Sequence, residues 1–538
     1  MELLSTLPRG LTEYPRLLEA VRARQTTALY GAAPVHRAHL AAALYADLPQ
    51  RTFCVVLRDE QAARTFAADL NALCGAETAV LPCRDLVFHN MEGVSHEYEQ
   101  QRLSALWQVK TGQVRVLCAP ADALMLRTLP PDGRENAART LLSTGSYQVE
   151  RLVERLLQAG YTRCSQVEGP GQFALRGGIL DVFPAGDTQP VRAEFWGDDV
   201  DSLGRFDPMT QRRSEPVDAV TILPVREALP TLAEGGIDGL CAALRKLAGR
   251  KTTRDALEKT LLSDADTLQE LRSLTAADRY LPQIYPEMAT ALSYLPEDTV
   301  FLCCDTPAVL ECAQGMAHRQ AQDLSHLLEE GLLPPTKTGY ALDEKQFKAA
   351  LTAPVLLDSF LAGSPFSPQV LLSLSAKQLP AAATGFDNLL RDITDYLRMD
   401  YTVLLLAGGR ARAQNLQQLL REQDIPCTTE EVQAGPKKVC ILPAALSAGA
   451  EYPSLKTVLF CEGALSTRKT AKRKSRSKDH IKSFSDLHPG DLVVHEHHGI
   501  GRFVGVERIQ VDKVWRDYIK IAFAGTDFVF VPATALTW

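Results

Sequence analysis

Short apolar runs alternate with segments of helical spacing along about the first 140 residues. Two segments, Asp59–Cys74 and Ser95–Lys110, repeat apolar residues every three or four positions, which indicates amphipathic helices. Three uniformly apolar runs are short enough to be buried strands: Thr27–Gly31, Thr52–Leu57 and Arg115–Ala119. Alternation of strand and helix predicts a parallel sheet with right-handed crossovers. We therefore expect an open α/β domain over residues 1–138.

The pattern changes over residues 139–225, where one helix precedes a series of strands. The predicted helix, Tyr147–Gly160, carries its apolar residues on one stripe: Val149, Leu152, Val153, Leu156 and Leu157. Four shorter segments alternate with period two and predict strands: Phe173–Arg176, Ile179–Phe183, Val191–Trp196 and Val200–Phe206. Gly177 and Gly178 separate the first two strands and predict a tight hairpin. This segment is therefore expected to form a compact α+β insert.

Three residues of the insert form a candidate binding site. Period-two alternation leaves Trp196 on the polar sheet face beside Arg192, and Arg176 can join them across the sheet. A tryptophan flanked by arginines on an exposed face has the composition of a protein-binding hot spot. The alternative is that Trp196 folds over the following turn and the arginines pair with Glu194 and Asp198.

A parallel sheet of this kind often binds nucleotide where its first strand ends, but the sequence there lacks the necessary groups. The segment GAAPVHRAHLAAAL, which begins at Gly31, has one glycine, no lysine and no Ser or Thr before its helix. A phosphate-binding loop needs glycines, a lysine for phosphate and a hydroxyl for magnesium. After the strand Val300–Leu302, the sequence CCDT stands where a metal-binding Asp-Glu pair would be expected. We predict a degenerate helicase-like domain without ATP hydrolysis, cofactor or catalytic residue.

Two further regions precede a basic segment. In the first, residues 226–350, the stretch 231–295 is rich in helical spacing; the second, residues 351–462, predicts a small α/β domain to which the sequence assigns no role. Within residues 463–482, TRKTAKRKSRSKDHIK holds eight Lys and Arg against one Asp, without apolar periodicity. Such a composition predicts a flexible linker. Two interpretations stay open: a solvated tether, or a weak and salt-sensitive contact with DNA phosphates.

The last segment, residues 483–538, predicts a small all-β module. Its expected strands are Asp491–His495, Gly501–Val511, Asp517–Phe523 and Asp527–Val531. Their number and length suggest an SH3- or Tudor-like barrel. The sequence HEHH at residues 495–498 contains metal-ligand types, but adjacent residues of a strand point to opposite faces and no cysteine is near. No metal site is therefore expected.

Composition places the 538-residue chain among ordinary globular proteins of several domains, with 46% hydrophobic and 23% charged residues. Its net charge of -7 argues against nucleic-acid binding over the whole surface. No apolar run approaches the roughly 18–20 residues of a membrane span, and the first residues do not have the pattern of a signal peptide. None of the 12 cysteines forms a CxxC pair. We expect a cytoplasmic protein with reduced core cysteines and no membrane contact.

Two quoted segments carry a family resemblance. ALRGGILDVFPAG, followed by VRAEFWGDDVDSLGRFDPMTQRR, resembles the second domain of UvrB and, more closely, that of the bacterial transcription-repair coupling factors, the Mfd family. VVHEHHGIGRFVGVERIQ resembles the RNA-polymerase-interacting domain of the same family, which is related to CarD. The resemblance implies UvrB-like domains 1a, 2 and 1b over residues 1–138, 139–225 and 226–350, and a CarD-like domain over residues 483–538.

The resemblance also implies partners for particular residues. In the family, the sheet face that matches Arg176, Arg192 and Trp196 binds the repair protein UvrA. The third of these positions is often Phe, so that Trp196 is a mild departure from the family pattern.

The CarD-like domain of the family docks on the β subunit of RNA polymerase, partly through an aliphatic residue on an exposed strand. The matching position is Ile509, with Glu507 and Arg508 beside it. Alternation places Ile509 on the face of Glu507 rather than with Val504 and Val506. The alternative is that Ile509 tucks under the following loop.

Together these features lead to a hypothesis of an adaptor, the N-terminal half of a coupling factor. It binds the β subunit of stalled RNA polymerase and recruits UvrA for nucleotide excision repair of the transcribed strand. The translocase motor, with its ATP and Mg²⁺ and the main contact with DNA, is expected to be absent from this chain. The alternatives are an ATP-dependent UvrB-like enzyme that acts on damaged DNA and a CarD-like transcription regulator.

Overall fold

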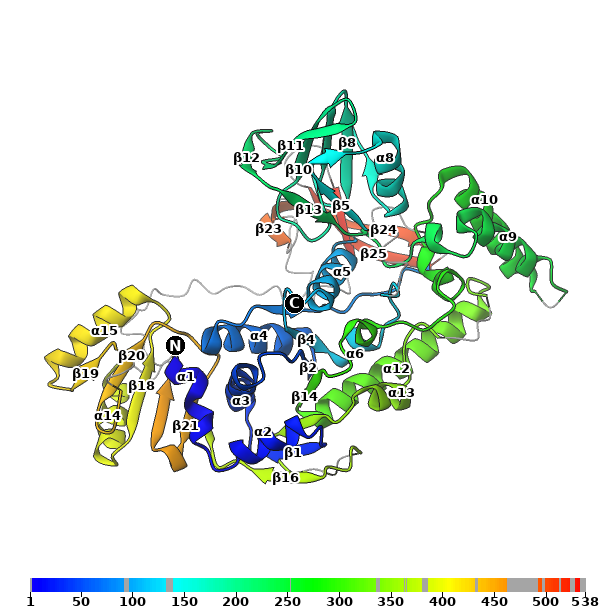
Figure 1. Cartoon of the computed structure of the whole chain (residues 1–538). Helices are drawn as coiled ribbons and strands as arrows, with labels where there is room; N and C mark the ends of the chain where they lie inside the picture. The colour runs from blue at the N-terminus through cyan, green and yellow to red at the C-terminus, as the bar shows by residue number, and fades with distance from the viewer. Residues whose placement is uncertain are drawn as a thin grey trace. The chain divides into compact units, whose positions relative to one another are not determined.

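The computed structural model describes most of the chain. The described residues are 2–90, 96–131, 139–251, 253–334, 339–361, 363, 365–379, 386–430, 434–461, 492–495, 499–511, 514–522 and 528–532. The chain divides into two compact units, Met1–Thr467 and Arg468–Trp538, which are described separately below. Both parallel and antiparallel sheets are present, so the predicted multidomain α/β class is confirmed at that level (Figure 1).

A parallel sheet forms the centre of the first unit. Within the described residues its order is β16-β1-β15-β14-β2-β4-β3. The strands are β1 (Thr27–Tyr30), β2 (Phe53–Leu57), β3 (Thr78–Val80), β4 (Val116–Pro120), β14 (Val300–Cys304), β15 (Val355–Asp358) and β16 (Val370–Ser373). Every pairing in this sheet is parallel, as strand–helix alternation predicts.

Helices cover both faces of this sheet, which explains why its strands are apolar throughout. One core packs α3 (Pro34–Asp47) and α4 (Glu60–Cys74) against the strands. The other face is covered by α5 (Glu97–Lys110), α6 (Ala121–Met125), α12 (Thr306–Glu329) and α13 (Glu344–Ala350). The two helices predicted between the first strands are thus present as α4 and α5.

The predicted domain boundary after residue 350 is too early. Strand β15 is buried and pairs with both β1 and β14, and β16 pairs with β1. The segment to about residue 373 therefore completes the first sheet. The reason is that strand pairing is a long-range property, and a four-residue apolar run does not show by itself which sheet it joins.

The α+β insert has the predicted hairpin. Its sheet order is β12-β11-β10-β9-β8-β7, with β6 (Gly145–Ser146) beside β11. The strands of the main path are β7 (Thr162–Arg163), β8 (Gln172–Arg176), β9 (Ile179–Val182), β10 (Val191–Trp196), β11 (Asp199–Phe206) and β12 (Arg213–Pro216). Strands β8 and β9 are antiparallel across the glycine turn, where Gly177 has φ of 59°.

Helix α8 (Val149–Gln158) covers one face of the insert sheet (Figure 1). Leu152 and Leu156 enter a common core with the inward residues of β8, β9 and β10. Leu157 was predicted to belong to the same stripe, but it is 50% exposed. It follows Leu156 by one position, about 100° around the helix, so it points away from the sheet.

A helical segment follows the insert. Helices α9 (Gly236–Ala248) and α10 (Asp255–Leu271) pack together in a hydrophobic core that also includes residues of α5 and α12.

The third region forms a six-stranded sheet of order β17-β21-β22-β18-β20-β19. Its elements are β17 (Lys377–Leu379), α14 (Phe386–Arg398), β18 (Thr402–Leu406), α15 (Arg410–Glu422), β19 (Cys427–Thr428), β20 (Val439–Leu442), β21 (Gly449–Tyr452) and β22 (Thr457–Phe460). Its mixture of helices and strands agrees with the α/β character predicted for this part of the chain. Residues of β18, β20, β21 and β22 share one hydrophobic core with α3 and α4. This sheet is therefore packed firmly against the first.

Two histidines are buried where these sheets meet. His36 and His39 lie on α3 with no measurable exposure, and the rings of both meet Tyr452 edge-on. The Nδ1 atom of His39 lies 2.7 Å from the hydroxyl of Tyr452. Burial lowers the pKa of His36 to about 4 and that of His39 to about 3. Both rings are therefore neutral at physiological pH.

We predict that acid weakens the first unit through these histidines. Below pH 6.5 the unfolded chain binds protons that the folded chain excludes, so the free energy of unfolding falls until about pH 4. One pKa unit corresponds to about 1.4 kcal/mol; each histidine therefore contributes on the order of 3 kcal/mol to this loss. In the variant His36→Asn/His39→Asn, the amide groups keep a polar atom near each Nδ1 position without a titrating group. Urea unfolding between pH 7 and pH 4 should show a smaller loss of stability for the variant than for the wild type. Parallel curves would contradict the assignment.

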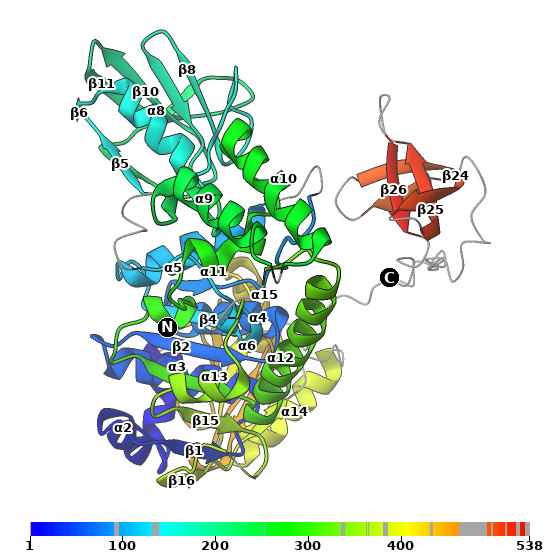
Figure 2. The same cartoon turned by 90° about the vertical axis from the view of Figure 1, so that its right-hand side faces the viewer.

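The second unit is an antiparallel meander of order β23-β24-β25-β26. Its strands are β23 (Leu492–His495), β24 (Gly499–Val511), β25 (Val514–Ala522) and β26 (Phe528–Pro532), close to the predicted positions. Figure 2 shows β24, β25 and β26 side by side. Phe503 pairs with Ile521 and both side chains are buried, which identifies the inner face. A bulge between Phe503 and Gly505 interrupts the alternation there, whereas the pairing with β25 is regular through residues 507–509.

Several expected absences concern the described ranges alone. There, no helix combines the length and the apolar character needed to cross a bilayer, and no cluster of His, Cys, Asp or Glu could hold a metal ion. All twelve cysteines are free thiols. The basic linker at 463–482 and residues 496–498 of the HEHH sequence lie outside the described residues.

Candidate functional site

The face of the insert sheet opposite α8 brings the three predicted site residues onto one surface, which we call the outer face. Strand register places Asp181 of β9 between Arg192 of β10 and Ala174 of β8. Arg176 stands two residues beyond Ala174 on the same side of its strand. Trp196 ends β10 on the side of Arg192. Residues from three strands therefore meet on this surface.

A single carboxylate organises the two arginines. Asp181 accepts two hydrogen bonds from Arg192, Nε to Oδ1 at 2.6 Å and Nη2 to Oδ2 at 2.8 Å. Arg176 donates from Nη2 to Oδ2 of the same carboxylate at 2.7 Å. The Asp181 side chain is only 1% exposed. Its hydrogen bonds raise the pKa of Arg192 above the ordinary value. The three groups together carry one net positive charge.

The two arginines differ in exposure. The Arg192 side chain is 16% exposed, and its guanidinium also covers the Phe206 ring at 4.4 Å from the centroid. Its Nη2 donates a further hydrogen bond to Oε1 of Gln211 at 2.9 Å. The Arg176 side chain is 47% exposed and makes none of these further contacts among the described residues. Arg176 therefore presents more of its guanidinium to solvent than Arg192 does.

Trp196 is 85% exposed, which agrees with the predicted position and excludes the alternative in which the ring folds over the turn. The predicted alternative partners of the arginines, Glu194 and Asp198, are also wrong, because Asp181 takes that role. Sequence reasoning missed Asp181. The signal was available: in the predicted strand Ile179–Phe183, alternation with the inward Leu180 and Val182 places residue 181 on the outer face.

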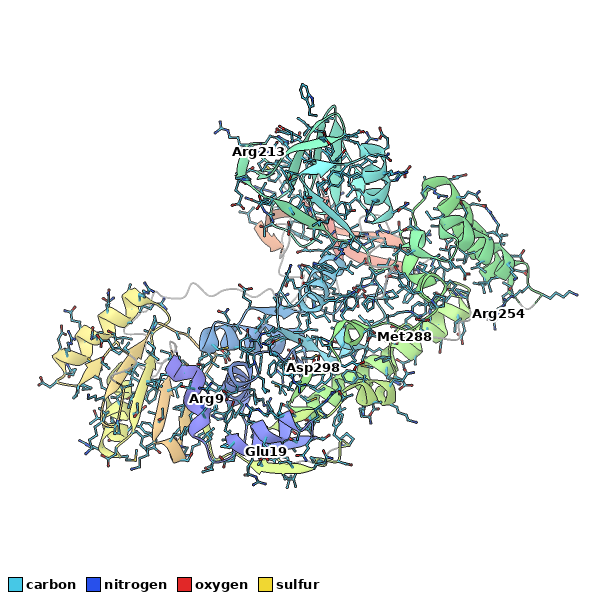
Figure 3. All side chains as sticks on the ribbon, viewed as in Figure 1. Arg9, Glu19, Arg213, Arg254, Met288 and Asp298 are labelled. Carbon is cyan, nitrogen blue, oxygen red and sulfur yellow. The ribbon has the colours of Figure 1, made fainter. Side chains whose placement is uncertain are left out.

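Polar contacts continue toward the edge of the sheet. Arg213 on β12, labelled in Figure 3, donates from Nη2 to the Ser202 hydroxyl at 2.8 Å. Ser202 in turn donates to Oε2 of Glu194 at 2.8 Å. A Cβ at Gly204 would lie 2.8 Å from Nε of Arg213, so the glycine leaves the arginine room to cross the sheet. The polar side chains at this edge are therefore paired with one another, although Arg213 and Glu194 remain partly exposed.

Glu227 fixes the end of the insert to the parallel-sheet domain. Its carboxylate accepts from Nε of Arg102 on α5 at 2.6 Å and from Nε of Arg84 at 3.2 Å. Arg84 also reaches Asp278 at 2.7 Å, and Glu99 accepts the backbone N–H of Glu227 at 2.7 Å. Four charged side chains of this cluster are nearly fully buried: Arg84, Arg102, Glu227 and Asp278. The outer face is thus carried by a firmly anchored module.

The region predicted to be a degenerate nucleotide site has internal contacts in addition to its missing lysine. Where the strands of the parallel sheet end, three helix N-termini already have internal partners. The N–H of Ala33 before α3 donates to Nδ1 of His36, and that of Ala62 on α4 donates to Asp59 at 2.7 Å. The N–H of Thr306 on α12 donates to Oδ1 of Asp358 at 2.6 Å. At each of these helix ends, one of the N–H groups that could bind phosphate is therefore already paired within the chain.

The backbone and charges of the same region also disfavour a nucleotide. Gly31 has φ of 82°, and a Cβ at this position would lie 2.1 Å from the carbonyl oxygen of Leu374, so the loop is closed against β16. Arg37 is buried and donates to the carbonyl oxygen of Ala32 and to Ser359. A cavity of about 290 Å³ nearby is lined by acidic as well as basic groups, including Asp69 and Asp305. The residues present do not fit ATP.

We predict that ATP does not stabilise the chain. A ligand present at 100 times its dissociation constant raises the free energy of unfolding by about 2.7 kcal/mol. Thermal unfolding with up to millimolar MgATP should therefore show no saturable shift, and no phosphate should be released. A phosphate-binding-loop ATPase assayed in parallel provides the positive control. A saturable rise in the unfolding temperature would contradict this interpretation of the capped helix ends.

The second candidate site lies on β24. Its predicted residues are Glu507, Arg508 and Ile509. In the backbone register with β25, Glu507 pairs with Tyr518, Arg508 with Asp517 and Ile509 with Arg516. The side chains of residues 507–509 lie outside what the structure describes. The strand that should carry them is therefore present, and their function stays a prediction.

Two sequence families match this chain, each at one candidate site. Residues 141–227 match the family described as "UvrB interaction domain", a range that contains the outer face. Residues 487–537 match the "CarD-like/TRCF RID domain", a range that contains residues 507–509. The chain thus combines a UvrB-type interaction module with a CarD-like module.

Several curated relatives, which share one name, align with most of this chain. It is 28% identical over 481 residues, 86% of its length, to the transcription-repair-coupling factor of Bacillus subtilis. It is 26% identical to the factors of Staphylococcus aureus and Staphylococcus epidermidis, over 99% and 96% of its length. The resemblance to transcription-repair coupling factors is therefore confirmed. The chain spans 40% to 46% of the length of these relatives.

Proposed function

We propose that this chain is the adaptor part of a transcription-repair coupling factor. In this proposal the outer face recruits UvrA, and the CarD-like module binds the β subunit of stalled RNA polymerase. The observation that carries it is the exposed Trp196 beside two arginines on Asp181, within the segment that matches the UvrB interaction domain. Recruitment would direct nucleotide excision repair to the transcribed strand.

The chemistry of the outer face supports protein binding. A tryptophan that is 85% exposed leaves a large apolar surface in water, and burial in a partner would remove that surface. Tryptophan and arginine dominate the energetic centres of protein interfaces. Because Arg176 and Arg192 share one carboxylate, a positive charge remains for the partner. We therefore expect UvrA to meet this face with an apolar pocket flanked by acidic groups.

The CarD-like module supplies the second contact. We propose that its four-stranded meander closes into an SH3- or Tudor-like barrel and that Ile509, with Glu507 and Arg508, contacts the polymerase β subunit. The family match over residues 487–537 supports this assignment. A contact through an exposed strand would add main-chain hydrogen bonds to side-chain specificity.

The remaining parts of the proposal concern chemistry and location. We propose that this chain itself catalyses nothing and that ATP-driven translocation, with Mg²⁺ and most DNA contact, belongs to the remainder of the longer factors. The basic residues of 463–482 add at most a weak, salt-sensitive DNA contact. The cytoplasm is the proposed site of action. A UvrB-like ATPase is disfavoured by the capped helix ends, and a CarD-like regulator leaves the outer face without a role.

We predict that the outer face determines UvrA binding. Purified chain should retain UvrA in a pull-down, and the variant Arg176→Ala/Arg192→Ala/Trp196→Ala should lose it, because interface centres of this kind contribute roughly 2 kcal/mol or more per residue. Arg151→Ala, on the covering helix α8, is the matched control and should bind normally. Circular dichroism checks that the triple variant is folded. Full retention of UvrA by the folded triple variant would contradict the assignment.

A separate prediction concerns RNA polymerase. Ile509→Ala should weaken binding to the isolated β subunit by about tenfold, the effect of losing a buried aliphatic contact of roughly 1.4 kcal/mol. Binding of UvrA should not change. Leu492→Ala, an exposed leucine on β23 of the same module, is the control. Equal affinities for wild type and Ile509→Ala would remove Ile509 from the proposed contact.

A further inference from the structure

The outer face contains one element to which no binding role has been given, the loop from Asp207 to Arg212. Asp207 closes it as a compact turn, because its Oδ1 accepts the N–H groups of Met209 and Thr210, each at 2.8 Å. Its backbone also receives the N–H of Gln211 at 2.8 Å. The hydrogen bonds to Asp207 lower the pKa of its carboxyl. The loop is therefore ordered by its own contacts.

Gln211 fastens this loop over the outer face. Its side-chain oxygen and its carbonyl oxygen both accept from Arg192, at 2.9 Å and 3.4 Å, and its amide donates to the carbonyl oxygen of Pro208 at 2.7 Å. Gln211 has φ of 60°, an unfavourable value for a residue with a Cβ. The contacts with Arg192 and Pro208 offset that cost. Since the Arg192 head group lies on the outer face, the loop crosses the same face.

Met209 stands at the tip of this loop and is 89% exposed. Packing within the described residues does not explain a large apolar side chain at this position, because Met209 is not part of a core and is not covered by another side chain there. Methionine is a flexible apolar group that adapts to irregular partner surfaces. Together with Trp196 at the end of β10, it gives the insert two exposed apolar residues; Arg192 lies on β10 itself and Arg176 on β8.

We propose that the residues of the outer face divide into two classes. Arg176, Trp196 and Met209 contact the partner. Arg192 does not; held on Asp181, it is a positioning residue that aligns Arg176 and fixes the Met209 loop through Gln211. This inference rests on the proposed function, which identifies the partner as UvrA, and it adds a contact and a positioning chain to that site.

The division follows from where the donors of each arginine point. The Nε and Nη2 groups of Arg192 donate to Asp181 and Gln211, and the plane of its guanidinium covers the Phe206 ring. Arg176 makes a single hydrogen bond with Asp181 among the described contacts, which leaves most of its five N–H groups for a carboxylate of the partner. An interface gains affinity when its contact residues are already held in place, because less conformational entropy is lost on binding.

The test measures UvrA affinity for single and double variants of the whole chain by biolayer interferometry. Met209→Ala and Gln211→Ala should each weaken binding at least about fivefold, the effect typical of residues above the threshold for interface importance. The loss of UvrA affinity in the double variant should be no larger than the larger of the two single losses, because Gln211 acts through Met209. Met399→Ala, an exposed methionine after α14, is the matched control and should bind as the wild type does.

Two further readouts separate contact from positioning. Arg176→Ala should flatten the salt dependence of the dissociation constant, whereas Met209→Ala should leave that slope unchanged, because only the first removes a charge contact. In Gln211→Ala, amide hydrogen exchange should rise in residues 207–212.

Wild-type affinity of Met209→Ala, or additive losses in the double variant, would overturn the inference while leaving the proposed function intact. Failure of the wild-type chain to bind UvrA would overturn both.

Discussion

The carboxylate of Glu227 lies between two buried arginines, and the placement of the insert depends on this contact. Arg102 comes from α5 of the parallel-sheet domain, and Arg84 connects Glu227 to Asp278 of the helical segment. Charges this deeply buried are costly to desolvate, and removal of one partner typically costs 3–5 kcal/mol, because an unpaired charge is left behind. A cluster of this kind tolerates little change in geometry. It therefore gives a peripheral module a defined attachment to the rest of the first unit.

The outer face is built on the same kind of ion-pair cluster, but part of this cluster is exposed to solvent. Asp181 is also a buried carboxylate shared by two arginines, but one of them, Arg176, remains about half exposed. The buried part of the cluster gives a fixed geometry, and the exposed part retains a charge that a partner can neutralise. Trp196 adds apolar surface beside it. The arrangement suits recognition, since a site is presented in one conformation and no group in it is placed for a reaction.

Local patterns predicted much of this structure, and the failures are mostly long-range. The glycine hairpin, the strands of the second unit and the exposure of Trp196 follow from period-two alternation and turn chemistry. The boundary at residue 350 failed because β15 pairs with β1, which lies more than 300 residues earlier in the chain. Asp181 was missed because a carboxylate inside an apolar strand has no visible partner until register brings Arg192 opposite it. The bulge after Phe503 likewise depends on pairing with β25.

The central claim is that this chain binds both proposed partners, UvrA and the β subunit of RNA polymerase, at the same time. Native mass spectrometry of the chain mixed with UvrA and the β subunit of RNA polymerase tests this most directly. The account predicts a complex that contains all three proteins and whose assembly does not require ATP. If UvrA and the β subunit formed only separate complexes with the chain, each displacing the other, the chain would not be an adaptor.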